Sequence, residues 1–478
     1  MIQEAQTLAV KRAQVEFHNF ASLGEPDRAF QVYAEENIRR SALIRNHLEL
    51  IGRMTPFLEI GANAGHSSYM LCNEFGCDGF ASDLSADSLR HGIALMDQWG
   101  LSRGPVRIAA DALHLPFADS SLRLVIAFQM LSQFMDIESV FVEVKRVLAP
   151  GGVFLFAEEP LRRKLTLRLF RCPYWETMKP WERKLYRWGL LGYLVKDVIG
   201  AGQEEGFGIR QNHSMELRDW HKLIRRHFDG HELELFVPER GVGERVVKRL
   251  ARRIDKARSD WFSARLLGGT IAAICKKAGE AEGKGGKVAP LALYLRCPDC
   301  AGHLVPDAKQ TLRCDACSYH APIDGGVYNL LRSADKKELY PGDRDDVIDF
   351  STPRHEKKLG DGWYELEGVF GNKFRGIGEQ ASATLRNVRG GAQRLRIRGH
   401  AHENLFQCVQ RPQIRVGVNG TPCATWKLNR VGLFVLETDI PQEPEYAIQI
   451  DASPSWRVST DDRTFTVSIS MIRLDPRS

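Results

Sequence analysis

Residues 57–68 read Phe57-Leu58-Glu59-Ile60-Gly61-Ala62-Asn63-Ala64-Gly65-His66-Ser67-Ser68. The apolar run that opens this stretch predicts a buried strand. Gly61 and Gly65 then allow a tight turn and a close approach of the backbone to a ligand. Ser67 and Ser68, with apolar residues after them, predict the start of a helix. Such a turn presents backbone N–H groups, beside which a carboxylate or phosphate is favoured.

Six further stretches predict a sheet built around this first strand. They lie at residues 79–85, 106–110, 122–128, 153–160, 232–237 and 269–276. A helix is predicted over residues 137–148, between two of these strands. Strands that alternate with helices indicate a parallel sheet, with ligands bound at the carboxyl ends of the strands. The predicted fold class of this part of the chain is therefore α/β.

Two carboxylates follow predicted strands. Asp83 ends the second strand, where an acid can accept hydrogen bonds from the hydroxyls of a ribose. Asp111 follows the third strand, where a carboxylate can accept a hydrogen bond from an adenine amino group. A helix cap or a turn acid is the simpler interpretation of Asp111. The family resemblance that these motifs carry together favours a ligand role.

The motifs together resemble one family. The series is Glu59-x-Gly61-x-x-x-Gly65, Asp83, Asp111 before Leu115-Pro116-Phe117, and Leu148-x-Pro150-Gly151-Gly152. It looks like the class I S-adenosylmethionine-dependent methyltransferases of type 11, closely over residues 30–160 and loosely over 205–277. NAD enzymes fit less well, because the turn has no G-x-G-x-x-G and the Pro-Gly-Gly bend is typical of the methyltransferases.

The resemblance implies a Rossmann-like domain with a seven-stranded sheet that binds S-adenosylmethionine. Gly61 and Gly65 would flank the methionine part, Asp83 would hold the ribose, and Asp111-Ala112 would meet the adenine. We expect Glu59 to orient the glycine loop more than to touch the ligand. The complete set of residues expected at the cofactor is Glu59, Gly61, Ala62, Asn63, Gly65, Asp83, Leu84, Asp111, Ala112 and Phe128.

Candidate catalytic residues lie near the same strand ends. His213 precedes a helix that Ser214 can cap, and a histidine there can act as a general base for a hydroxyl acceptor. A loop hydrogen bond is the simpler role of His213. Glu158, with Glu159 beside it, and Gln129 lie at the ends of strands five and four. A basic and aromatic insertion at residues 160–230 is expected to roof the acceptor pocket, although most of its tryptophans are expected to form a small core.

A basic helix is predicted over residues 245–258. Val247, Leu250, Ala251 and Ile254 share one face, and the opposite face is rich in arginine and lysine. Together with the aromatic insertion, this helix can make peripheral contact with an anionic membrane or lie along a nucleic-acid backbone. A solvated charged face is the commoner meaning of such a pattern. We regard nucleic acid as the less favoured partner.

The second half begins with a glycine-rich linker at residues 278–290. Cys297, Cys300, Cys314 and Cys317 then form two C-x-x-C pairs, with thirteen residues between Cys300 and Cys314. Four thiolates at this spacing predict a tetrahedral zinc site, whereas a redox pair is the weaker alternative. The segment resembles zinc ribbons that accompany tRNA and protein methyltransferases. Because four cysteines leave no open coordination position, we expect the zinc to be structural.

The rest of the chain alternates with period two. Strands are predicted at residues 395–399, 413–420, 433–437, 446–450 and 464–470, with a hairpin turn at Asn419-Gly420. No long helix intervenes, so an all-β sandwich with a jelly-roll-like form is predicted. It resembles sandwich domains attached to bacterial glycan-pathway enzymes. If the domain binds sugar, an exposed Trp363 would stack on it, whereas the simpler interpretation of Trp363 is an ordinary core residue.

The predicted organisation has five parts. They are an N-terminal helical lid (1–52), a methyltransferase domain (53–277), a linker (278–290), a zinc ribbon (291–335) and a β-sandwich (340–478). The scattered cysteines outside the ribbon suit a reducing cytoplasm better than a disulfide framework, and the N-terminus lacks the pattern of a secretory signal. The net charge of +6 is mild and does not by itself indicate a nucleic-acid partner.

The predicted function is methyl transfer from S-adenosylmethionine to an oxygen or nitrogen acceptor, favouring a sugar or a glycan- or lipid-linked small molecule. Two alternatives stay open: a tRNA or protein methyltransferase that carries its zinc ribbon in cis, and a non-catalytic scaffold that binds a glycan. No Asn-Pro-Pro-Tyr motif follows strand four, which disfavours N-methylation of a base or of glutamine but names no other acceptor.

Overall fold

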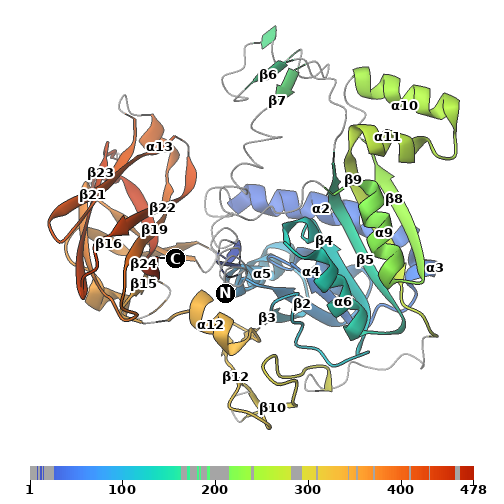
Figure 1. Cartoon of the computed structure of the whole chain (residues 1–478), viewed down its shortest axis with the longest axis horizontal. Coiled ribbons are helices and arrows are strands. Elements are labelled where there is room, and N and C mark those ends of the chain that lie inside the picture. The colour runs from blue at the N-terminus through green and yellow to red at the C-terminus, as the bar shows by residue number, and fades with distance from the viewer. Residues whose placement is uncertain are drawn as a thin grey trace. The chain divides into compact units, whose positions relative to one another are not determined.

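The structure is a computed structural model of the whole chain (Figure 1). It describes residues 8, 11–12, 14–15, 26–162, 170–172, 180–181, 184, 191–193, 215–237, 242–280, 293–307, 311–342, 344–350, 352, 354–369, 372–407, 411–429, 431–457 and 463–477. The chain forms two compact units. The first comprises residues 1–15 and 31–333, and the second comprises residues 16–30 and 334–478.

The first unit is organised around a nine-stranded sheet with the order β13-β14-β3-β2-β1-β4-β5-β9-β8. Strands β1 to β5 run parallel to their neighbours, whereas β9 is antiparallel to both β5 and β8. The strands are β1 (Phe57–Ile60), β2 (Gly79–Asp83), β3 (Val106–Ala109), β4 (Leu122–Phe128), β5 (Leu148–Leu161), β8 (Gly230–Phe236), β9 (Gly269–Lys276), β13 (Ile323–Asp324) and β14 (Val327–Asn329).

Helices cover this sheet. They are α2 (Pro26–Asn46), α3 (Leu48–Ile51), α4 (His66–Glu74), α5 (Ala86–Trp99), α6 (Ile137–Val147), α9 (Leu217–His227), α10 (Val242–Ile254) and α11 (Ser259–Leu267), with a 3-10 turn, η1 (Leu131–Gln133). Two short strands, β6 (Phe170–Cys172) and β7 (Leu191–Tyr193), pair in parallel. Among the described residues, none of the helices has the length and apolarity needed to cross a bilayer.

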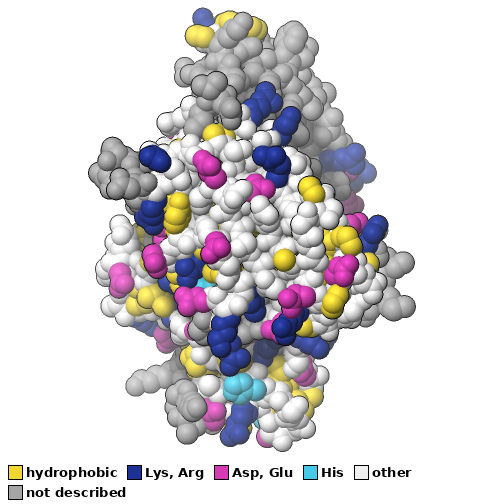
Figure 2. Space-filling view, turned by 90° about the vertical axis from the view of Figure 1, so that its left-hand side faces the viewer, with side chains coloured by type: hydrophobic (Ala, Val, Ile, Leu, Met, Phe, Trp, Pro, Cys, Tyr) yellow, Lys and Arg dark blue, Asp and Glu magenta, His cyan; other side chains and the backbone are white. Residues whose placement is uncertain are grey.

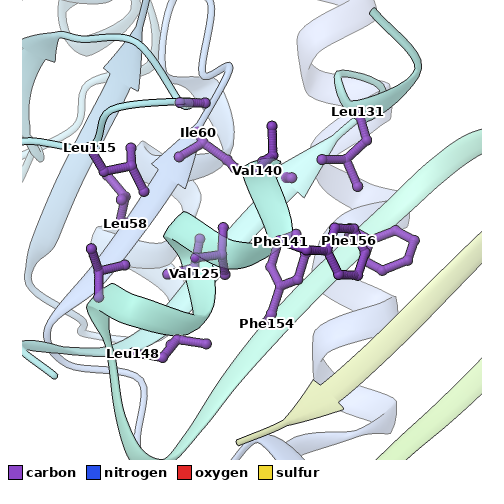
Figure 3. Close-up of a cluster of buried hydrophobic side chains, with 14 of the residues drawn as sticks. Leu58, Ile60, Leu115, Val125, Leu131, Val140, Phe141, Leu148, Phe154 and Phe156 are labelled. Carbon is purple, nitrogen blue, oxygen red and sulfur yellow. The ribbon is translucent and has the colours of Figure 1, made fainter. Parts of the chain in front are cut away.

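A continuous apolar core lies between α6 and the sheet. In Figure 3, Val140 and Phe141 of α6 point toward Val125 of β4 and toward Phe154 and Phe156 of β5. All of these side chains are fully buried. Because the parallel strands are apolar on both faces, they read in the sequence as unbroken apolar runs, and this is why their positions could be predicted.

The cysteine-rich segment joins the same sheet. Strands β10 (Leu304–Pro306), β11 (Leu312–Cys314) and β12 (His320–Ala321) form a small antiparallel sheet. β14 then pairs in parallel with β3, and Leu330 donates its N–H to the carbonyl of Ala109 at 2.8 Å. The sheet is therefore larger than the seven strands predicted, because β13 and β14 extend its edge.

The second unit consists of two antiparallel sheets over one apolar core. One contains β15 (Val347–Asp349), β16 (Trp363–Val369), β17 (Asn372–Ile377), β19 (Gln393–Ala401), β22 (Gly432–Ile440) and β24 (Val467–Pro476). The other contains β18 (Gln380–Arg386), β20 (Gln413–Val418), β21 (Thr421–Lys427) and β23 (Glu445–Ser453). Asn419 and Gly420 have positive φ and form the predicted two-residue turn between β20 and β21.

The remaining elements of this unit are short. They are α12 (Ser333–Leu339), which follows the cysteine-rich segment, the 3-10 turn η4 (His355–Lys358) and α13 (Glu403–Phe406). Figure 2 shows one face of the molecule, on which acidic and basic side chains are interspersed and apolar side chains are scattered.

Two local predictions are wrong. Helix α9 is capped by Glu216, whose N–H is donated to the carboxylate of Asp219 at 3.1 Å, and the helix begins at Leu217. Ser214 is therefore not its cap. Trp363 is half-buried against the core of its unit, and its indole N–H is donated to the carbonyl of Ser382 at 2.7 Å. Trp363 is thus a packing residue and not the exposed aromatic that sugar stacking requires.

Candidate active site

The glycine turn lies at the carboxyl end of β1, as predicted. Gly61, Asn63 and Gly65 all have positive φ, and Gly65 is the residue before helix α4. A Cβ on Gly61 would lie 2.8 Å from the Cβ of Met130, so that position admits no side chain. The turn therefore depends on glycine both for its backbone conformation and for the space that it leaves beside the residues after β4.

Glu59 stabilises this turn through hydrogen bonds from Ser68. Its carboxylate accepts the backbone N–H of Ser68 at 2.8 Å and also the hydroxyl of Ser68. The side chain is fully buried, and this burial raises the pKa of Glu59 to about 7. The contacts of Glu59 are those of a residue that holds the N-terminus of α4 against β1.

The carboxylate of Asp83 links the glycine turn after β1 to the loop after β2. One carboxylate oxygen accepts the N–H of Asn63 at 2.8 Å, and the other accepts the N–H of Ser85 at 2.8 Å. The side chain is buried at the end of β2, and Leu84 follows it in a half-buried position. Asp83 thus links the glycine turn to the second strand end, where the remaining lone pairs of its carboxylate can meet a ribose.

Asp111 lies after β3, and Ala112 is buried beside it. One carboxylate oxygen accepts the N–H of Leu113 at 3.0 Å. The other lies 2.8 Å from Nζ of Lys11, near the N-terminus of the chain. The carboxylate that is expected to meet an adenine amino group is therefore paired with a lysine of this chain.

Gln129 and Glu158 come together at the ends of β4 and β5. The amide of Gln129 is donated to Oε2 of Glu158 at 3.0 Å. Both residues have positive φ, which is uncommon for residues other than glycine and costs about 1–3 kcal/mol each. Because Arg40 also donates to Oε2 of Glu158, at 2.7 Å from Nη2, this strained pair is held by an ion pair.

The neighbouring Glu159 has a different role. It is fully buried and accepts the N–H groups of Met130 (2.8 Å), Leu131 (2.8 Å) and Ser132 (3.0 Å). Burial raises its pKa to about 7. Glu159 therefore fixes the turn η1 after β4 and does not face the pocket as a rival to Glu158.

Helix α2 supplies residues that the sequence did not reveal. Arg40 is buried over the ring of Phe128, 4.4 Å from its centroid, and Nη1 lies 2.6 Å from Nε2 of His66. Glu36 lies 2.8 Å from the same nitrogen, and the ring of Tyr33 stacks on His66. Burial lowers the pKa of His66, so its imidazole is neutral near pH 7.

The sequence pattern that could have indicated Glu36 and Arg40 is weak. Glu36 and Arg40 are four residues apart, so they share one side of a helix, but an ion pair at that spacing is common on exposed helices. Tyr33 lies in the segment that the sequence predicts as an N-terminal helical lid. His213 and the insertion around it, residues 194–214, lie outside the described residues.

The four cysteines of the predicted metal site converge. Their sulfur atoms all lie within 4.8 Å of one another, and three separations are 3.4, 3.5 and 3.7 Å. A tetrahedral zinc with Zn–S bonds of about 2.3 Å requires sulfurs roughly 3.8 Å apart. All four are free thiols, so the donor set fits a zinc ion with four cysteine ligands, which would be held closed and structural.

Comparisons with known proteins agree with this geometry. The family model Methyltransf_11, described as a methyltransferase domain, matches residues 58–156. Those residues include the glycine turn, Asp83, Asp111 and Gln129. A malonyl-[acyl-carrier protein] O-methyltransferase of Geobacter sulfurreducens is 30% identical over 102 residues, which are 21% of this chain and 37% of that protein.

Two further relatives are each similar to part of the chain. Methyltransferase GfsG of Streptomyces halstedii is 29% identical over 108 residues (23% of this chain, 39% of the relative). Norajmaline N-methyltransferase of Rauvolfia serpentina is 25% identical over 130 residues (27% and 42%). The chain spans less than half the length of each of these relatives.

The fold and the site thus define a class. Residues 58–156 form a methyltransferase domain of the kind that uses S-adenosylmethionine. These relatives include both an O- and an N-methyltransferase, so they leave the type of acceptor atom open.

Proposed function

We propose that this protein transfers a methyl group from S-adenosylmethionine to an oxygen or nitrogen of a small acceptor. The observation that carries the proposal is the pair of buried carboxylates, Asp83 and Asp111, at the ends of adjacent parallel strands beside a glycine turn. This arrangement suits a ligand with a ribose and an adenine. When bound, S-adenosylmethionine supplies a methyl group that is electrophilic because of the adjacent sulfonium.

The residues of this chain would then act mainly by positioning. Glu59 and Asp83 fix the glycine turn, and Glu159 fixes the turn after β4. Gln129 and Glu158 present polar atoms at the ends of β4 and β5, where an acceptor can be oriented in line with the methyl group. Because Glu158 is tied to Arg40 and Gln129, we assign it a role in orientation and not in proton removal.

The acceptor that we favour is a sugar or a glycan- or lipid-linked molecule. The support is the attached pair of antiparallel sheets, although Trp363 is not the residue that would present such a molecule. We further propose that the protein works in the cytoplasm with a structural zinc ion. The free cysteines and the convergent cluster of four thiols support both statements.

Isothermal titration with S-adenosylmethionine tests the proposal directly. We expect the Asp83→Ala variant to bind at least about tenfold more weakly, because the ribose loses a charged acceptor. Asp97→Ala is the matched control, since Asp97 is exposed on α5. Both variants must keep the melting temperature of the parent.

Two outcomes would reject the proposal. One is no detectable binding of S-adenosylmethionine by the parent protein. The other is undiminished binding by Asp83→Ala in a protein that folds normally. A screen of glycan and lipid-linked acceptors with labelled cofactor would then identify the methylated atom.

A further inference from the structure

Two helices after β8 carry most of the net positive charge of the chain. α10 and α11 pack against each other and lie side by side in Figure 1. Residues 242–267 contain eight Lys and Arg residues but only three Asp and Glu residues, in a chain whose net charge is +6. The methyl-transfer chemistry uses none of these residues, so the surface calls for a separate explanation.

Only part of the apolar side of α10 is covered. Ala251 is buried, Val247 is half-buried, and Lys248 reaches Asp260 of α11 with a separation of 3.6 Å. These residues form the face that packs against α11. The sequence analysis placed Leu250 and Ile254 on the same helix face as Val247 and Ala251, and in the structure Leu250 and Ile254 are exposed.

The uncovered part of α10 forms an apolar strip of Val246, Leu250 and Ile254. Val246, Leu250 and Ile254 have exposed fractions of 48%, 51% and 78%, and residues four apart lie along one side of a helix. On α11, Phe262 (39%) and Leu266 (43%) are also four apart and exposed. Exposed apolar side chains that repeat at this spacing on two packed helices are typical of an interaction surface, whereas single exposed ones are ordinary.

A basic strip of arginines runs beside the apolar strip. Arg245, Arg249 and Arg253 each precede one of the three apolar residues, so they repeat with the same spacing one position away on the helix. All three are exposed, as is Arg252. The solvent-facing side of α10 is therefore itself divided into a basic strip and an apolar strip.

We propose that this surface docks on an anionic lipid bilayer. The apolar strip would enter the boundary between headgroups and acyl chains, and the arginines would pair with lipid phosphates. Nucleic acid fits less well, because it would engage the arginines and leave the apolar strip in water. A second copy of the same surface would bring like charges together. A bilayer is the partner that uses both strips.

This proposal is independent of methyl transfer. It predicts where the protein works and not what it methylates. If both proposals hold, docking would bring the enzyme to the surface at which a lipid-linked acceptor is found.

The test is sedimentation of the full chain with vesicles. We expect binding to vesicles of phosphatidylcholine with an equal share of phosphatidylglycerol, weaker binding at high salt, and little binding to phosphatidylcholine alone. Leu250→Ser with Ile254→Ser should lower the partition coefficient about tenfold, because the apolar insertion is lost. Arg249→Gln with Arg253→Gln should lower it by a similar factor of about ten.

The matched control is Val388→Ser with Val431→Ser, two exposed valines of the second unit, which should bind like the parent. Since every substituted side chain is exposed, all variants should keep the parental melting temperature. Three outcomes would overturn the proposal: no binding to anionic vesicles, equal binding by the apolar and control variants, or RNA binding that depends on the arginines while vesicle binding is absent. Loss of a dimer in the apolar variant, without vesicle binding by the parent, would show self-association in its place.

Discussion

Lys11 and Asp111 form an ion pair at the position expected for the adenine. The lysine ammonium lies 2.8 Å from one carboxylate oxygen of Asp111, and both side chains are largely buried. An adenine amino group that donates to this carboxylate would compete with the ammonium. We therefore expect the ion pair to set part of the cost of cofactor binding.

We accordingly expect Lys11→Met to raise the affinity for S-adenosylmethionine by about fivefold, which corresponds to about 1 kcal/mol. Titration calorimetry measures this change, and Lys276→Met, an exposed lysine at the end of β9, serves as the control. A lower affinity in Lys11→Met would show that Lys11 contacts the bound cofactor and does not compete with it.

Glu59 gives the stability of the first unit a dependence on pH. Burial raises its pKa to about 7, so between about pH 4.5 and 7 the folded protein holds a proton that the unfolded chain has released. The free energy of unfolding should therefore fall as pH rises through this interval, by up to about 1.4 kcal/mol per pH unit for this group. Its stabilising effect is complete below pH 4.5.

Denaturant unfolding of Glu59→Gln at several pH values tests this expectation. The amide oxygen of Gln can still accept the N–H of Ser68, so the variant should fold and show a flatter profile. Glu49→Gln, at an exposed position of α3, should keep the slope of the parent. Identical profiles for all three proteins would mean that Glu59 does not titrate in this range.

At the level of elements, β14 connects the cysteine cluster to the cofactor site. β14 pairs with β3, and Asp111 follows β3 after one residue. Tyr319, which lies two residues after Cys317, donates its hydroxyl to the carbonyl of Leu331 at 2.8 Å, just beyond β14. The position of β14 therefore depends on the fold of the cysteine-rich segment.

Removal of the metal should consequently affect both stability and cofactor binding. We expect a chelator, or Cys300→Ser with Cys317→Ser, to lower the melting temperature by about 5 °C or more. The affinity for S-adenosylmethionine should fall at the same time. Cys423→Ser in the second unit should change neither quantity. A purified protein without zinc by atomic absorption, yet with full affinity, would contradict this prediction.

The sequence predicted the first unit well where local patterns determine structure. The seven strands predicted between residues 57 and 276 lie close to their predicted positions, because most of them are apolar runs bounded by turn residues. The pairing of β14 with β3 could not be predicted, since Val327–Asn329 is three residues long and its partner is distant in sequence. Arg40 was missed for the same reason: its importance comes from Glu158 and His66, which lie near it only in the folded chain.

At the level of the whole molecule, the two compact units divide near residue 333 and not at the glycine-rich linker. The cysteine-rich segment belongs to the unit that contains the cofactor site. A chain that ends at residue 333 should thus bind S-adenosylmethionine within about threefold of the full chain, because distant sites contribute nearly independently.

A chain that ends at residue 290 should instead lose measurable affinity, because β13, β14 and the cysteine cluster are missing. Titration calorimetry on both truncated chains measures their affinities for S-adenosylmethionine. Equal affinity of the shorter chain would show that β3 keeps its position without β14. Loss of binding by the longer chain would show that the second unit contributes to the site.

The pairing of β14 with β3 also has a consequence for solubility. Without β14, the backbone N–H and C=O groups of one side of β3 would face water in a row, which is a template for strands of other molecules. We therefore expect protein treated with a chelator to associate edge to edge through β3, and gel filtration of such samples should reveal this as growing oligomers. The cysteine-rich segment, which the sequence predicts as a separate domain, would thus also protect the edge of β3 from aggregation.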